Sequence, residues 1–260
     1  MSAPVFLAEE GGLDGDTAVL RGPEGRHAAA VRRIAPGEEV DLVDGAGTRA
    51  RCTVTEVGKD TVVCAVRERR TEPEPRPRLT VLQALPKRDR GELAVEMMTE
   101  AGVDRIVPWT AERCVARWKG DRAAKSLAKW RSTAREAAKQ ARRARVPEVA
   151  EPVGRDGAAA LLAKADLGLV LHEEAGLPLS QVALPAGALP AGGGADSADA
   201  PEGGEGIVLA VGPEGGVSED ELDVFDAAGA QRALLGPTVL RTSTAGVAAL
   251  AVLQARCGRW

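Results

Sequence analysis

The chain is poor in the residues from which metal centres and disulfide frameworks are built. Only two histidines and four cysteines occur in 260 residues, and the cysteines are scattered without a CxxC pair. This spacing indicates neither a metal site nor a disulfide framework. No apolar run approaches the roughly 20 residues of a membrane helix, and residues 1–16 do not resemble a signal peptide. We therefore expect a soluble cytoplasmic protein with no bound metal and no membrane partner.

Positive charge is concentrated in one stretch, although the chain as a whole is acidic. The net charge is −4, yet residues 113–145 hold twelve lysines or arginines and two acids, so the remainder carries −14. A helix predicted over residues 121–144 separates an alanine-rich side from a basic side. A solvated face is the ordinary alternative, but such faces mix both signs, and the scarcity of acids here costs self-repulsion. We expect the basic side to bind the phosphates of a polyanion.

A spacer with alternating prolines, residues 71–78, divides the chain. Before it, residues 39–43, 48–57 and 61–66 read as short strands separated by turn signals, which predicts a small β-barrel or sandwich. We place this first domain at residues 1–72.

The second domain, residues 73–260, alternates strand and helix patterns. Such alternation predicts an α/β domain with a mostly parallel sheet. The expected strands are residues 79–85, 105–108, 167–171, 207–211 and 233–235, and the expected helices are 89–101, 121–144 and two that begin near 218 and 242. Residues 185–206 are rich in glycine, alanine and proline and are expected to be a disordered insertion.

A glycine-rich loop follows one of the expected strands. Residues 207–211 run into Gly-Pro-Glu-Gly-Gly at 212–216, and Ser218 and Glu221 then have the spacing of a capping box. Loops at the carboxyl ends of strands are where α/β proteins bind ligands. Because Glu214 would repel a phosphate, a neutral or cationic ligand suits the loop, and the sulfonium of S-adenosylmethionine is one candidate. A simple tight turn is the alternative.

A second loop has the same layout. Residues 233–241 lead into an apolar helix that Thr242, Ser243 or Thr244 can cap. Arg241 precedes that helix, where the helix dipole disfavours a cation. We interpret Arg241 as a functional group.

These two loops resemble the C-terminal signatures of the ribosomal RNA small-subunit methyltransferase E family, which belongs to the SPOUT superfamily. The signatures are GPEGG at 212–216 and LGPTVLRT at 235–242. Residues 99–108 and 135–147 resemble the family segments TELGV..I.P and EA.EQ..R..VP, and residues 27–40 resemble H...VLR...GDE. Apart from the insertion, nearly the whole chain is covered, and the combination is highly specific.

The resemblance implies an N-terminal PUA-like RNA-binding β-barrel and a C-terminal SPOUT domain with a trefoil knot. It also implies a homodimer, S-adenosyl-L-methionine as cofactor, and methylation at N3 of a uridine in 16S ribosomal RNA of the small subunit. The cofactor-binding residues that it implies are Leu171, Val211, Gly212, Pro213, Glu214, Gly215, Gly216, Leu235, Gly236, Leu240 and Thr242. With the basic helix, it implies these RNA-binding residues: Arg33, Arg131, Arg135, Lys139, Gln140, Arg142 and Arg143.

Uracil N3 carries a proton that must leave when the methyl group is added. Arg241 is the candidate for stabilising charge on the flanking carbonyl oxygens, or else for anchoring a substrate phosphate. Glu173 and His172 are the candidate general bases, although residues at a strand end are more often structural hydrogen-bond partners. The target base must be unstacked to be reached.

Two positions depart from the family pattern, which usually has Glu where this chain has Ser243 and often Lys where it has Met97. The change at Ser243 keeps one alternative function open, a non-catalytic RNA-binding assembly factor. A second alternative is a ribose 2′-O-methyltransferase of the same superfamily. A nicotinamide dehydrogenase is a weaker alternative because the dinucleotide fingerprint is absent.

Overall fold

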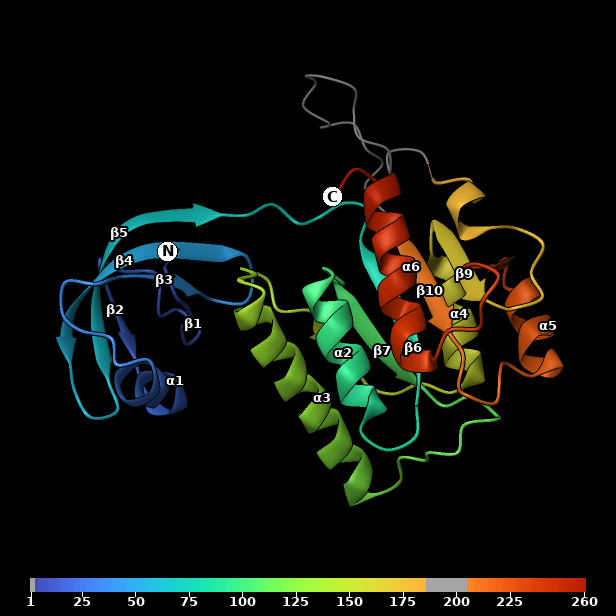
Figure 1. Ribbon diagram of the computed structural model, residues 1–260, viewed down its shortest axis with the longest axis horizontal. Helices are drawn as coiled ribbons and strands as arrows, with labels where there is room; N and C mark the ends of the chain where they lie inside the picture. Colours follow the sequence, from blue (N-terminus) through green and yellow to red (C-terminus); the bar gives the residue numbers. More distant parts are fainter. Residues whose placement is uncertain (1–2, 186–204) are drawn as a thin grey trace. The chain divides into compact units, whose positions relative to one another are not determined.

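The computed structural model describes residues 3–185 and 205–260 of the chain (Figure 1). The chain splits into two compact units: Met1–Glu74 with Arg135–Val146, and Pro75–Ala134 with Pro147–Trp260. Apart from its two ends, the predicted insertion at 185–206 lies outside the described residues. Among the helices of this described part, none is both long and apolar enough to cross a membrane.

The first unit is a curled mixed sheet of five strands in the order β1-β3-β4-β5-β2. Its elements are β1 (Val5–Leu7), β2 (Thr17–Leu20), α1 (Gly22–Arg26), the π-helix η1 (His27–Val31), β3 (Glu39–Val43), β4 (Thr48–Val57) and β5 (Val62–Thr71). Neighbouring strands are antiparallel except β1 and β3, which are parallel. The three strands expected from sequence are present, and β5 continues to Thr71. The short strands β1 and β2 escaped prediction because three or four residues give too little alternation.

Alternate side chains in the middle of β4 and at the start of β5 enter the core of this unit. Ala50, Cys52 and Val54 of β4 alternate with half-buried or exposed neighbours, as the two-residue period of a strand requires. Burial raises the pKa of the Cys52 thiol to about 12 and that of Cys64, on β5, to about 11. Both thiols are therefore neutral members of an apolar core.

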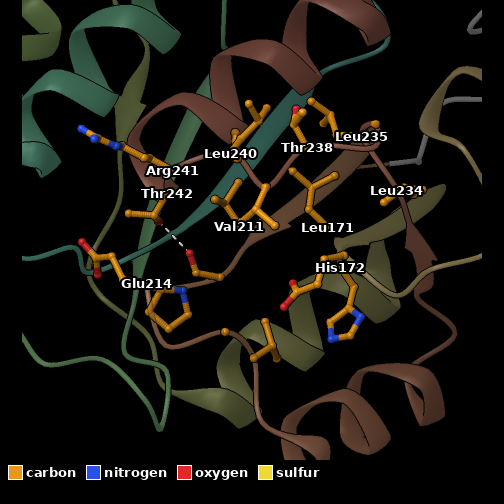
Figure 2. Close-up of a pocket in the computed structure, with 18 of the residues that line it drawn as sticks. Leu171, His172, Val211, Glu214, Leu234, Leu235, Thr238, Leu240, Arg241 and Thr242 are labelled. Carbon is orange, nitrogen blue, oxygen red and sulfur yellow. Dashed lines mark hydrogen bonds between the residues drawn. The ribbon is translucent and has the colours of Figure 1, made fainter.

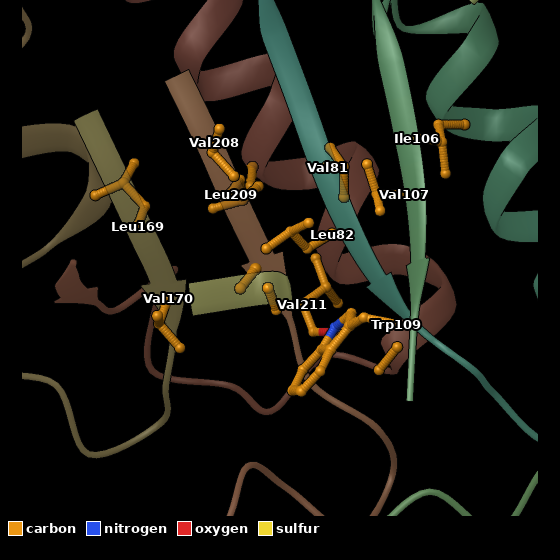
Figure 3. Close-up of a cluster of buried hydrophobic side chains, with 14 of the residues drawn as sticks. Val81, Leu82, Ile106, Val107, Trp109, Leu169, Val170, Val208, Leu209 and Val211 are labelled. Carbon is orange, nitrogen blue, oxygen red and sulfur yellow. The ribbon is translucent and has the colours of Figure 1, made fainter. Parts of the chain in front are cut away.

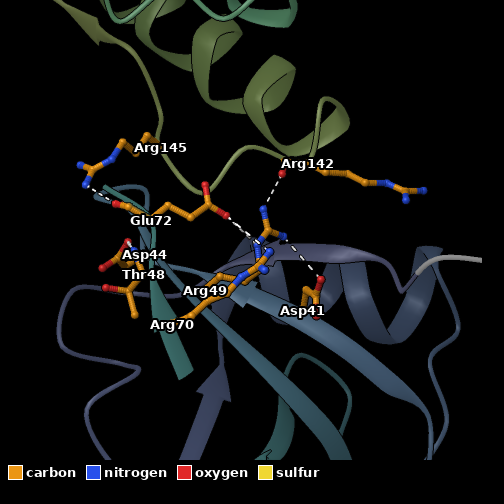
Figure 4. Close-up of polar contacts among 8 residues, drawn as sticks. All are labelled: Asp41, Asp44, Thr48, Arg49, Arg70, Glu72, Arg142 and Arg145. Carbon is orange, nitrogen blue, oxygen red and sulfur yellow. Dashed lines mark hydrogen bonds and ion pairs between the residues drawn. The ribbon is translucent and has the colours of Figure 1, made fainter. Parts of the chain in front are cut away.

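Arginines organise the polar side of the same sheet (Figure 4). The Arg49 guanidinium donates to Glu72 Oε1 at 3.1 Å, to Asp41 Oδ2 at 3.4 Å and to the Arg142 carbonyl at 2.6 Å. Arg145 donates to the carbonyls of Ala46 and Glu72. These bonds hold residues 135–146 to the sheet, which explains why that segment belongs to the first unit although sequence patterns assigned it to the second domain.

A tight turn joins β3 to β4 and is held by Asp44. Its Oδ1 accepts hydrogen bonds from the backbone amides of Ala46 and Thr48 at 2.7 and 2.9 Å. Burial alone would raise the pKa of Asp44, but the hydrogen bonds from the Thr48 side chain and from the backbone of this turn outweigh it and hold the pKa below its usual value. The ionised carboxylate therefore stabilises the turn.

The second unit is built on a six-stranded parallel sheet in the order β11-β9-β10-β6-β7-β8. Its strands are β6 (Leu79–Ala84), β7 (Arg105–Trp109), β8 (Glu148–Val149), β9 (Leu167–Leu171), β10 (Ile207–Val211) and β11 (Gln231–Ala233). Aliphatic side chains of the central strands form its core (Figure 3). Trp109 is fully buried beside them, and its indole N–H donates to the Val211 carbonyl at 3.0 Å. The α/β domain with a mostly parallel sheet is thus confirmed.

The helices of this unit are α2 (Arg90–Glu100), α4 (Arg155–Lys164), α5 (Glu219–Ala227) and α6 (Thr242–Arg256), with the short 3₁₀-helix η2 (Leu179–Gln181). Helix α2 contacts α6, and α4 contacts α5. The Gln254 amide on α6 donates to the Ala101 carbonyl just after α2, which fixes the ends of these two helices together. The strand expected at 233–235 was displaced: β11 ends at Ala233, and the following residues begin the loop.

Helix α3 (Asp121–Gln140) is the basic helix, and it spans the boundary between the two units. It ends four residues before the predicted Ala144. Arg142 has φ 55°, and the amides of Arg142 and Arg143 donate to the carbonyls of Lys139 and Ala138. This is the Schellman pattern that closes a helix, and no glycine marks it in the sequence.

Candidate active site

The predicted site residues lie at one edge of the parallel sheet. Strands β9, β10 and β11 are neighbours and run in the same direction, so their carboxyl ends meet at the same edge. The loops that leave those ends are residues 172–178, 212–218 and 234–241. Three segments far apart in the sequence are thus brought together by strand pairing alone.

The glycine loop after β10 has a fixed backbone. Gly216 has φ 75°, which favours glycine, and its amide donates to the Pro213 carbonyl at 2.9 Å. The predicted capping box is confirmed: Ser218 Oγ accepts from the Glu221 amide, and Glu221 Oε2 accepts from the Ser218 amide. Glu221 Oε1 also accepts from the Glu112 amide at 2.7 Å. The buried Glu221 carboxylate therefore holds the end of the loop to both Ser218 and Glu112.

The second loop is not capped in the predicted way. The N-cap of α6 is Arg241, and no side chain caps the helix. The Thr242 hydroxyl donates instead to the Gly212 carbonyl at 2.6 Å, and the Thr244 hydroxyl donates to the Arg241 carbonyl at 3.1 Å. The Thr242 side chain therefore ties the second loop to the first, as the dashed line in Figure 2 shows.

Gln83, near the end of β6, extends this link and was missed by the sequence analysis. Its fully buried amide nitrogen lies 3.2 Å from Thr242 Oγ1, 3.4 Å from the Thr242 carbonyl and 3.1 Å from the Ala84 carbonyl. Hydrogen bonds from Gln83 to Thr242 and from Thr242 to Gly212 therefore connect strand β6 with both loops. A single glutamine in a strand gives no signal of such a role, because its partner is 159 positions away.

The loops enclose one pocket of about 430 Å³ (Figure 2). The predicted residues that line it are Leu171, His172, Glu173, Val211, Gly212, Pro213, Glu214, Gly216, Leu235, Gly236, Leu240, Arg241 and Thr242. The lining residues that were not predicted are Val217, Leu234, Pro237, Thr238, Val239 and Ala245. Gly215 is absent from the lining, and its carbonyl instead accepts from Arg113 at 3.4 Å. The pocket has an apolar wall and a polar backbone rim, the usual character of a cofactor site.

The three predicted catalytic side chains lie at different places on this pocket. The exposed Arg241 guanidinium is on one side, and the His172 ring is on the opposite side (Figure 2). His172 Nδ1 accepts from the Glu174 amide at 3.3 Å, so this ring has a structural hydrogen bond as well as a place at the pocket. Glu173 is exposed. The structure thus brings Arg241 and the two candidate bases to one pocket but not to one another.

The predicted RNA-binding residues are placed less uniformly. Arg33, Arg135 and Gln140 are exposed, and Arg131 pairs with Glu151 at 3.0 Å. The Arg142 and Arg143 amides close helix α3, as described above. Lys139 is not on an exposed surface: its side chain is 6% exposed, and Nζ pairs with Glu24 at 2.5 Å and Glu136 at 3.2 Å. A helical projection cannot show that a partner from α1 covers one cation of the basic side.

The two departures from the family pattern lie on helices α6 and α2. Ser243 is 3% exposed in the first turn of α6, and Met97 is half-buried on α2. Neither is among the described residues that line the pocket. The changes at these positions therefore leave its walls intact.

Comparison with known proteins gives consistent results for both parts of the chain. Residues 72–254 match the model of the RNA methyltransferase domain, and residues 20–67 match that of the RNA methyltransferase PUA domain. The ribosomal RNA small subunit methyltransferase E of Mycobacterium bovis is 43% identical over 100% of this chain and 94% of its own length.

Two solved structures share the fold over nearly their whole length. The ribosomal RNA small subunit methyltransferase E of Neisseria gonorrhoeae, bound to S-adenosyl methionine, has a TM-score of 0.81 and 29% identity, and 98% of each chain is covered. A Legionella pneumophila protein in complex with the cofactor SAM has a TM-score of 0.82 and 27% identity, with the same coverage. With its sequence, its two domain models and its fold in agreement, this chain belongs to the ribosomal RNA small subunit methyltransferase E family.

Proposed function

We propose that the protein is an S-adenosylmethionine-dependent methyltransferase that methylates N3 of a uridine in 16S ribosomal RNA of the small subunit. The observation that carries the proposal is the pocket to which both glycine loops contribute, in a chain of this family. Relatives of the family are named for methylation of small-subunit ribosomal RNA, and two structural neighbours hold the same methyl donor. The particular atom, N3, rests on the family resemblance.

The residues of the pocket fit this methyl donor. Leu171, Val211, Leu235 and Leu240 supply apolar surface for an adenine ring, and the glycine loop presents backbone groups rather than side chains. The volume lies within the range of roughly 300–1,000 Å³ that is usual for such ligands. When bound, the cofactor supplies an electrophilic methyl group on a positively charged sulfur. We assign the cofactor contacts to the predicted residues that line the pocket. Gly215 does not line it, and we assign this residue a role in shaping the glycine loop.

Arg241 is the proposed catalytic cation. Its exposed side chain stands at the N-terminus of α6, where the helix dipole costs about 0.3–1 kcal/mol for a cation. Among the described residues, the structure gives its guanidinium no ion pair that would compensate. A fixed cation stabilises the negative charge that develops on the uracil oxygens when N3 loses its proton. As N3 gains the methyl group its proton must go to a base, and His172 and Glu173, which line the pocket, are the proposed bases.

The larger architecture follows the same family. We propose that residues 1–72 form a PUA-like RNA-binding β-barrel and residues 73–260 form the methyltransferase domain. We also propose that the loops at the site form a trefoil knot. We also propose a cytoplasmic homodimer. Exposed residues of the predicted RNA surface, including Arg33, Arg135 and Gln140, remain available for the phosphate backbone.

The ribose 2′-O-methyltransferase and the assembly factor without activity are the rival functions. The second drew its support from Ser243. That residue is buried and is not among the described residues that line the pocket, which weakens this rival. The test is incubation of the purified protein with methyl-labelled S-adenosylmethionine and small subunits from a strain that lacks the gene, followed by nucleoside analysis. Label in 3-methyluridine is expected. Label in a ribose would replace the proposal by the first rival, and RNA binding with no label would replace it by the second.

A further inference from the structure

Two basic segments border the glycine loop of the pocket. Glu214 Oε1 accepts from the Lys87 amide at 3.1 Å and lies 4.0 Å from Arg90 Nη1. From another direction, Arg113 Nη1 donates to the Gly215 carbonyl at 3.4 Å. The loop is therefore in direct contact with the segments that carry Lys87, Arg88, Arg90 and Arg113. We call these four side chains the basic rim.

Part of the basic rim has no structural duty. The side chains of Lys87 and Arg88 are exposed, and the structure gives neither an ion pair nor a hydrogen bond with another described residue. Lys87 makes its contact with Glu214 through the backbone amide alone. The chain carries a net charge of −4, so solubility alone does not call for free cations at the pocket. Unpaired cations beside a pocket leave their charge available to a ligand.

The backbone of Arg88 strengthens this interpretation. Arg88 has φ 57° and is one of three non-glycine residues with positive φ in the described part of the chain. Arg33 and Arg142, the other two, follow η1 and α3, where a residue of this conformation closes a helix. Arg88 instead precedes α2, so no helix end explains it. Such a conformation is strained in a non-glycine residue, and glycine would adopt it freely.

We propose that the basic rim binds the phosphates that flank the target base in the RNA strand, and so holds that strand at the mouth of the pocket. This inference rests on the proposed function, because it supposes that a base of RNA enters the pocket. An unstacked base leaves its neighbouring phosphates at the surface, and arginine and lysine are the side chains that contact phosphates. The rim differs from the basic helix to which sequence patterns assigned RNA binding.

The decisive variant is Lys87→Ala with Arg88→Gly in the full chain. It removes two charges but no hydrogen bond, and glycine also relieves the backbone strain at position 88. Affinity for a 16S ribosomal RNA transcript is measured at several salt concentrations, and affinity for S-adenosylmethionine is measured by calorimetry. Each lost contact with a single-strand phosphate lowers RNA affinity roughly fivefold near 0.1 M salt, so the double variant is expected to bind RNA about 25-fold more weakly. The slope of log affinity against log salt concentration should become smaller by about 1.4. Cofactor affinity stays unchanged.

Lys164→Ala is the matched control. Lys164 is an exposed cation at the end of α4 that lies just before β9, hence at the amino-terminal edge of the sheet, away from the pocket. It is expected to keep full RNA affinity. Equal RNA binding by the double variant and the wild type would overturn the proposal, and so would a parallel loss of cofactor binding, which would show that the segment only supports the loop. A wild-type protein that binds the cofactor but no ribosomal RNA would instead overturn the proposed function.

Discussion

Cations on the polar side of the first sheet and cations at the carboxyl edge of the second sheet have different partners. In the first unit, Lys139 is buried against Glu24, and Arg49 and Arg145 donate to carboxylates and carbonyls of the same unit. At the carboxyl edge of the second sheet, Arg241 and Arg88 are exposed and have no such partner within the described parts of the chain, 3–185 and 205–260. The same residue types thus maintain a fold in one place and remain available to a ligand in the other.

This difference shows why counting charges is a poor guide to a binding surface. The stretch 113–145 holds twelve lysines or arginines against two acids, yet several of its cations contact their own chain: Arg117, Arg131, Lys139 and Arg145. The segment 87–90, Lys-Arg-Asp-Arg, is too short to stand out when charge is counted along the chain. A cation is informative when the structure leaves it without a partner.

The largest effect is expected at Arg241. Replacing it with alanine removes the cation proposed to stabilise charge on the base, and losing one such group costs about 10²–10³ in kcat. Methyl transfer to small subunits is measured together with cofactor binding, which is expected to persist. Arg232→Ala is the control, because Arg232, on the outer strand β11, is already paired with Asp226 of helix α5. Normal turnover of the Arg241 variant would place the functional cation elsewhere.

Lys139 tests the other side of the comparison. Lys139→Met leaves the Glu24 carboxylate, itself only 21% exposed, without its cation, and breaking a buried pair from one side costs about 3 kcal/mol. We expect a lower unfolding temperature of the first unit in calorimetry. Arg135→Ala, an exposed cation one turn earlier on the same helix, is expected to change stability by less than about 0.5 kcal/mol. Equal stability of the two variants would return Lys139 to the RNA surface.

Sequence patterns predicted the parts of this structure that depend on near neighbours. Strand β10, the glycine loop and the capping box of α5 follow each other within 15 residues, and each was predicted in place. The contacts that were missed join distant positions: Lys139 with Glu24 across 115 residues, and Gln83 with Thr242 across 159. The end of helix α3 depends on near neighbours but was still missed, because Arg142 closes it with a positive φ that arginine seldom adopts. Pairing partners are properties of the fold rather than of local composition.

A smaller effect is expected from the buried neutral contacts at the site. Thr242→Val keeps the shape of the side chain but leaves the Gly212 carbonyl and the Gln83 amide without their shared partner. The loops then lose their link, and we expect about tenfold weaker cofactor binding, since each such hydrogen bond contributes about 0.5–1.5 kcal/mol. Thr242→Ser keeps the hydroxyl and should bind nearly as the wild type does. RNA affinity serves as the second measurement, because it should remain the same in both variants.

The smallest effect concerns ionisation in the core of the first unit. Burial raises the pKa of Cys52 to about 12 and of Cys64 to about 11, from an ordinary value of 9.0. The unfolded chain therefore loses these thiol protons above pH 9 while the folded chain keeps them, so the free energy of unfolding falls as the pH rises from 9 towards 11. Each thiol contributes about 1 kcal/mol per pH unit. Cys64→Ala should reduce that slope in chemical denaturation and leave the slope between pH 7 and about 8 unchanged. Parallel curves for the variant and the wild type would show that the core thiol is accessible to solvent, and the contrast between a closed first unit and an accessible site edge would then fail.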